Sequence, residues 1–181
     1  MAAILTSLRN TVIVGFVLTA LLIINYANNG GVFDHLWGAF ILRYIHVLSG
    51  IMWIGLLYYF NFVQIPNMPN IPDEQKPAIG KVIAPAALWW FRWGAMFTMG
   101  SGLLLAHANG YLVSALTLEN TLIGIGMWLG LIMWFNVWFV IWPNQKRALG
   151  IVEADADTKA ASARTAMLFS RTNTLLSIPM L

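Results

Sequence analysis

The sequence predicts an all-α fold, a polytopic membrane bundle with four spanning helices in a single membrane domain over residues 1–181. The first observation behind this prediction is composition: 59% of the residues are hydrophobic and only 9% are charged, whereas a soluble domain carries about 25% charged residues. The second is a mean hydropathy of +0.72. The third is that four stretches approach the roughly 20 apolar residues that a spanning helix needs.

The first expected span follows Arg9 and ends before the turn-like run of Asn and Gly at residues 28–31. The second is long enough to tilt. A proline-punctuated polar loop then covers residues 66–81, where continuous helix is not expected. The last span should end at the run Trp-Pro-Asn-Gln over residues 142–145. The four expected spans are residues 11–27, 36–65, 82–107 and 122–142.

Residues 152–169 are polar and rich in alanine, with acidic residues ahead of basic ones. That order suits a helix macrodipole and predicts a surface helix. Residues 173–181 are apolar, but nine residues are too few to span a bilayer. They predict either an interfacial foot or the start of a fifth helix.

Basic residues give the orientation, because Lys and Arg are retained in cytoplasmic loops. Eight of the ten lie outside the expected spans, and all eight fall on the side of the amino terminus, which is therefore expected in the cytoplasm. They are Arg9, Lys76, Lys81, Lys146, Arg147, Lys159, Arg164 and Arg171. The net charge of +3 reflects this topology, and nucleic acid is not an expected partner. With no Cys, the chain has no disulfide, thiolate metal ligand or catalytic thiol.

Ionisable residues inside a span are costly and mark functional sites. His46 and Arg43 share one face of the second span, and Ser49 and Gly50 follow one turn later, where small side chains leave room for a flat cofactor. This pattern suggests haem b, with a His46 nitrogen on the iron and Arg43 near a propionate. The alternative is a histidine that packs helices by bonding to a neighbouring carbonyl group.

A second axial ligand has few candidates. Met99 lies at about the depth of His46, although methionines in apolar helices more often fill space. His107 lies near the outer end of the third span, and His35 is about three turns from His46 on the same helix, so neither is expected on the same iron.

Other intramembrane polar residues have more ordinary interpretations. Arg92 lies in an aromatic run, which favours an arginine that snorkels beneath an aromatic belt over an anion site. Gly126 and Gly130 form a G-x-x-x-G face that predicts close helix packing. Asn136 is expected either to bond across helices or to contact a substrate.

Several motifs together resemble the membrane domain of the bacterial membrane-bound urate oxidases, or urate hydroxylases. The resemblance runs in order from the second span to the end of the sequence. The histidine-tryptophan pattern of the second span is also similar, more distantly, to the four-helix membrane protoporphyrinogen oxidases that bind haem b. The matching motifs are RYIHVLSGIMWIG (43–55), FRWG (91–94), GSG (100–102), NVWFVIWPNQK (136–146) and SRTNTLLSIP (170–179).

The resemblance implies an oxidoreductase-like protein of the bacterial inner membrane that passes electrons to a quinone or a cytochrome. Relatives that act on urate carry a cytochrome c domain with C-x-x-C-H, which this Cys-free sequence lacks. A separate cytochrome or other membrane subunits are therefore the expected partners, beside membrane lipid. The competing hypothesis is a cofactor-free accessory subunit of a larger electron-transfer complex. A transporter is a third hypothesis, but so few spans leave little room for inverted repeats.

Overall fold

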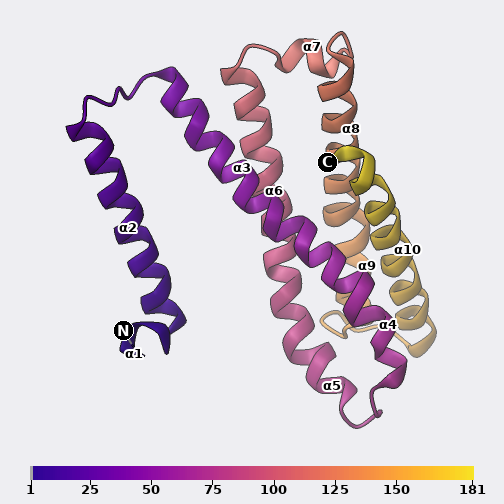
Figure 1. Ribbon diagram of the computed structural model, residues 1–181. Coiled ribbons are helices and arrows are strands. Elements are labelled where there is room, and N and C mark those ends of the chain that lie inside the picture. Colours follow the sequence, from indigo (N-terminus) through magenta and orange to yellow (C-terminus); the bar gives the residue numbers. More distant parts are fainter. Residues whose placement is uncertain (1) are drawn as a thin grey trace. The chain divides into compact units, whose positions relative to one another are not determined.

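The computed structural model describes residues 2–181, which form helices joined by turns, with no strand among the described residues (Figure 1). Three helices are long and apolar enough to cross a membrane: Leu8–Asn28, His35–Asn70 and Thr121–Ala148. The all-α prediction is confirmed, and these helices fit a multi-pass membrane protein. The helix over the third expected span, α6 (Ala84–Ala108), is not one of the three. The chain divides into two compact units, residues 1–38 and 39–181.

The first unit contains α1 (Ala2–Leu5) and α2 (Leu8–Asn28), which covers the first expected span. Ser7 caps α2, because its hydroxyl accepts a hydrogen bond of 3.4 Å from the backbone N–H of Asn10. The helix ends at the expected turn, where Gly30 has a φ of +81°, a value that glycine adopts without strain.

Helix α3 (His35–Tyr58) begins the second long helix and continues without a break through η1 (Tyr59–Gln64), α4 (Ile65–Asn67) and η2 (Met68–Asn70). The prediction of a loop from residue 66 is therefore wrong. Only residues 71–75 separate this helix from the next, which begins with α5 (Lys76–Ala78) and η3 (Ile79–Ile83) and leads into α6.

A wider π turn explains how helix passes through proline. A proline lacks an N–H, and its ring collides with the carbonyl group four residues earlier. The residue before each proline bonds five residues back instead: Ile65 N–H donates to Phe60, Ala84 to Ile79 and Trp142 to Val137. Each π turn ends two residues before its proline, which is Pro66, Pro85 or Pro143, so each proline follows a helix that is already widened.

A π turn also carries the last long helix past the end that the sequence predicted for it. Helix α8 (Thr121–Phe135) passes through η4 (Asn136–Ile141) into α9 (Trp142–Ala148), and the chain turns only at Gly150. The asparagine after the proline supports the turn, because Asn144 Nδ2 donates to the Val140 carbonyl at 2.8 Å. Asn67 makes the same bond to Val63 after Pro66, at 2.7 Å. A short helix, α7 (Leu112–Leu116), precedes α8.

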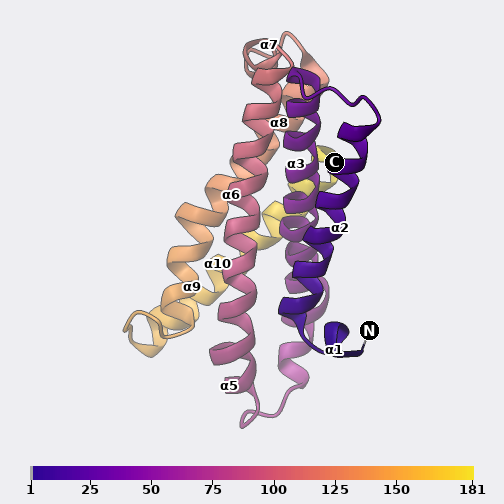
Figure 2. The ribbon, with the colours of Figure 1, turned by 90° about the vertical axis from the view of Figure 1, so that its left-hand side faces the viewer.

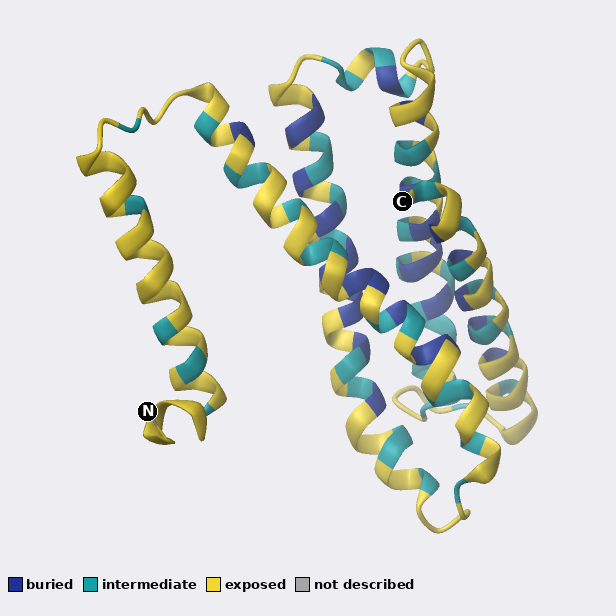
Figure 3. Ribbon diagram, in the orientation of Figure 1, coloured by how far each residue is buried: buried dark blue, intermediate teal, exposed yellow. Residues whose placement is uncertain are grey.

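The structure also differs from the expected surface helix and separate apolar foot. One helix of 25 residues, α10 (Ala156–Met180), covers both, and it packs along α8, η4 and α9 (Figures 1 and 2). Its small and polar residues recur every three or four positions and form one buried face (Figure 3). The packing of this face, rather than an apolar composition, therefore stabilises the helix. The buried residues are Ser162, Ala166, Ser170, Asn173 and Ser177.

The core of the second unit lies where α3, α6, α8 and α10 meet. Gly94 of α6 allows close approach to α3, since a Cβ there would lie 3.2 Å from the backbone nitrogen of Trp53. Trp53, Leu57, Phe91 and Met133 are almost completely buried around this crossing. The crossing fixes how α3 and α6 face each other at His46, two turns away from Trp53 along α3.

Candidate functional site

The candidate site is built around His46, which α3 presents to α6. Its Nδ1 lies 2.8 Å from the backbone oxygen of Thr98, and this contact joins the two helices. Ser101 Oγ is more distant from the same nitrogen, at 3.5 Å, and donates to Phe97 instead. The contact with a neighbouring carbonyl group is the one expected of a helix-packing histidine.

The Thr98 contact also fixes the tautomer of a neutral imidazole. A carbonyl oxygen only accepts hydrogen bonds, so Nδ1 must carry the proton and Nε2 keeps its lone pair. No hydrogen bond to Nε2 is formed within residues 2–181. A metal-ligating histidine makes this same bond through the nitrogen that does not bind the metal. The geometry therefore serves packing and leaves a basic nitrogen available.

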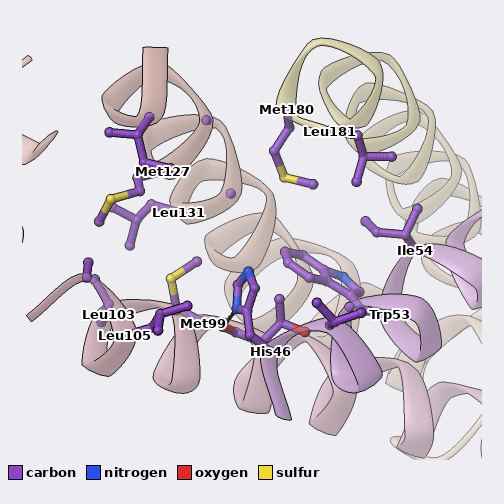
Figure 4. A pocket seen from close by; sticks show the side chains of 18 of the residues that line it. His46, Trp53, Ile54, Met99, Leu103, Leu105, Met127, Leu131, Met180 and Leu181 are labelled. Atoms are coloured by element: carbon purple, nitrogen blue, oxygen red, sulfur yellow. Dashed lines mark hydrogen bonds between the residues drawn. The ribbon is translucent and has the colours of Figure 1, made fainter. Parts of the chain in front are cut away.

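Nε2 faces a cavity of about 700 Å³ within the second unit. Figure 4 shows the His46 imidazole pointing into this cavity, with Met99 and Trp53 also lining it. Residues of α3, α6, α8 and the end of α10 form the wall, which is mostly apolar. A volume of this size is in the range of small-molecule and cofactor sites.

Several glycines form part of the cavity wall. Gly50 of α3, Gly102 of α6 and the pair Gly126 and Gly130 of α8 all line it. The G-x-x-x-G face lies opposite the end of α10 at ordinary contact distance, because a Cβ at Gly126 would lie 3.5 Å from the Met180 carbonyl oxygen and one at Gly130 3.7 Å from the Met180 sulfur, so the expected close helix packing at this face stays a prediction.

The sequence-predicted residues divide into two groups. His46, Gly50 and Met99 line the cavity. Arg43 and Ser49 do not: Arg43 is exposed, and Ser49 Oγ donates to the Ile45 carbonyl at 2.7 Å and accepts from Thr98 Oγ1 at 3.1 Å. Ser49 therefore helps to fix α6 against α3. Arg43 lies one turn from His46, outside the wall of the cavity.

The other histidines lie elsewhere, as expected. His107 is exposed in the last turn of α6, and His35 begins α3; neither lines the cavity. Within the described part of the chain, no group of three or more His, Asp or Glu residues could hold a metal ion by itself. The metal-binding capacity of this cavity therefore rests on the Nε2 atom of His46 and the thioether sulfurs of its methionines.

Buried amides, of which the sequence analysis singled out only Asn136, hold α10 against the neighbouring helices. Asn136 bonds across helices as expected, donating to Asn173 Oδ1 at 2.9 Å, and Asn173 donates onward to the Met133 carbonyl at 3.0 Å. Asn61 likewise donates to Ser170 Oγ at 2.8 Å. These bonds place Met180, at the end of α10, in the cavity wall. The sequence signal that could have predicted these interhelical hydrogen bonds is the recurrence of small and polar residues at every third or fourth position of α10.

Arg92 does not snorkel as expected. Its side chain is only 8% exposed, and its guanidinium carbon lies 3.4 Å from the ring centroid of Trp142, on α9. In the aromatic run around Arg92, Phe91 is buried, whereas Trp89, Trp90 and Trp93 are exposed. This second polar feature lies outside the cavity wall.

Comparisons with known proteins give no further assignment. No family model matches the sequence, and no curated protein or solved structure is significantly similar to it.

Proposed function

We propose that this chain is a multi-pass redox protein of the bacterial inner membrane that binds haem b through His46 and passes electrons to a quinone or a cytochrome. The observation that carries the proposal is that His46 Nε2 has no hydrogen-bond partner among the described residues at the cavity wall, while Nδ1 donates a 2.8 Å hydrogen bond to the Thr98 carbonyl group. That bond orients the ring and leaves Nε2 as an iron ligand at the wall of a large apolar cavity. The proposal follows the resemblance to the membrane domain of the urate hydroxylases.

The residues around the cavity fit the iron and the faces of a porphyrin. A neutral imidazole nitrogen is a common ligand of haem iron, and glycines leave space for a flat ring. Met99 also lines the cavity, and its thioether is the proposed second ligand. Bound haem b would supply one-electron transfer. The chain itself orients His46 through Thr98 and excludes water with its apolar wall.

The propionate carboxylates of a haem need a basic residue as their partner. The cavity wall contains no Lys or Arg. Arg43 is the nearest basic residue to His46 along α3, and its exposed side chain is long enough to reach beyond one turn of helix. We assign Arg43 to a propionate that leaves the cavity on that side.

The proposed topology has four spans, with α6 as the third and the amino terminus in the cytoplasm. The support is the one-sided distribution of the eight Lys and Arg residues outside the expected spans. Helix α6 has 25 residues, which is enough to cross a bilayer, and its Arg92 is shielded by protein. A c-type haem that accepts the electrons would have to belong to another protein segment, because residues 1–181 contain no Cys to attach one.

The decisive experiment is an absorption spectrum of the purified chain, oxidised and reduced. We expect a Soret band that shifts on reduction and is lost in His46→Ala, whereas His107→Ala, which changes an exposed histidine outside the cavity, keeps it. A haem spectrum that persists in His46→Ala would contradict the assignment of the ligand.

A cofactor-free accessory subunit is the second candidate, and the lack of basic residues in the cavity wall favours it. An apolar cavity between helices also suits a side chain from a neighbouring membrane subunit. This function predicts a stable, colourless protein that co-purifies with a specific membrane partner. His46→Ala would then weaken assembly without any spectral change.

A further inference from the structure

Arg92 is a buried cation without a counter-ion. Its side chain is 8% exposed, and its Nη1 atom is buried without a hydrogen-bond partner. The one salt bridge among the described residues joins Asp73, in the loop before α5, to Lys76, the first residue of α5, and does not involve Arg92. A guanidinium that is withdrawn from water without an anion is costly, so its retention calls for a compensating group.

Trp142 of α9 compensates part of that cost and brings in a second cation. The Arg92 guanidinium carbon lies 3.4 Å from the centroid of the indole ring, and Lys146 Nζ lies 5.7 Å from the same centroid. Both distances are within the range of cation–π contacts. The indole has no net charge, so two positive charges remain gathered around one ring.

The location of this pair suits a membrane headgroup. Lys146 and the exposed Arg147 form the last turn of α9, where the chain leaves its long apolar helix. Trp142 lies six residues before Ala148, where this helix ends, and tryptophans near the ends of spans lie at the headgroup level. Basic pockets between helices at this level bind the phosphates of anionic lipids, and a guanidinium matches phosphate oxygens in pairs.

We propose that Arg92 and Lys146, held together by Trp142, bind the phosphate of an anionic phospholipid headgroup. The arginine anchors the phosphate from the protein side, and the lysine, half-buried one turn after Trp142, closes over it. The site lies outside the wall of the His46 cavity and does not depend on a haem.

The test compares thermal unfolding of the full chain in detergent with added phosphatidylglycerol, phosphatidylcholine or inorganic phosphate. We expect phosphatidylglycerol alone to raise the unfolding temperature. Lys146→Gln should lower the apparent affinity for phosphatidylglycerol by about fivefold to tenfold. The matched control is Arg147→Gln, which removes the same charge from the adjacent exposed position and should leave that affinity within about twofold.

Two results would overturn the proposal. Equal losses in Lys146→Gln and Arg147→Gln would show general attraction to a basic surface rather than a site. Equal stabilisation by inorganic phosphate at the same ionic strength would show that the ligand is a free anion and not a lipid. Arg92→Lys, which keeps the charge but loses the paired donors, should weaken phosphatidylglycerol binding at least as much as Lys146→Gln.

Discussion

Gly102 of α6 lies so close to His46 of α3 that a Cβ at position 102 would fall 2.8 Å from Cε1 and 3.0 Å from Nδ1 of the imidazole. The ring is thus confined between the Thr98 carbonyl group and the backbone at Gly102. Replacing this glycine is a way to move the His46 ring without removing it.

Gly102→Ala should displace the imidazole and break its bond to Thr98. We expect a loss of about 1–3 kcal/mol in unfolding free energy, typical of overpacking, and a several-fold loss of any haem that the protein binds. Gly100→Ala is the matched control, since nothing lies within 4 Å of a Cβ at that position of the same helix. Equal haem content and stability in the two variants would show that the ring position is not confined by Gly102.

The buried pair Asn136 and Asn173 should hold α10 against η4. Asn136→Ala leaves the Asn173 oxygen without its donor in a position of 0% exposure, and we expect a loss of about 1–2 kcal/mol. Equilibrium unfolding in mixed detergent measures it. The control Asn67→Ala removes an exposed asparagine that bonds only to its own helix, and should cost less. A double variant with Asn173→Ala should be non-additive, and strict additivity would show that the two amides act independently.

The first turn of α10 should loosen in acid. The Thr158 backbone N–H and hydroxyl group hold the pKa of Asp155, the N-cap, below its ordinary range. A lowered carboxyl pKa adds stability above the pKa of the unfolded state, and that stability is lost as pH falls through the folded pKa, here below about pH 4. Amide exchange at Thr158 should accelerate in that range relative to Asp155→Asn, which keeps the cap but does not titrate. Identical pH profiles in the two proteins would contradict this.

The absence of native cysteine makes topology directly measurable. Asn29→Cys, in the turn after α2, should react with an impermeant thiol reagent from the periplasmic side. Asp73→Cys, in the loop before α5, should react only after the membrane is permeabilised. The reverse pattern would place the amino terminus outside and invert the proposed orientation.

Composition, apolar run length and local sequence were enough to predict an all-α membrane-type chain, the turn at Gly30, and His46 as the residue to examine. These features depend on local chemistry: the cost of charge in lipid, the length needed to span it, and the backbone angles that glycine tolerates. Met99 and Gly50 were also identified, because their spacing along a helix gives their depth and face.

Other features depended on contacts between distant segments. Pro66 and Pro143 looked like breakers, but each follows a π turn that a local rule does not include. The polar face of α10 resembled a solvated surface until Asn136 and Asn61 supplied its partners from other helices. Arg92 looked like a snorkelling residue until α9 brought Trp142 over it. A residue's polarity is a property of the sequence, but whether it faces lipid, water or a partner depends on which helix packs against it.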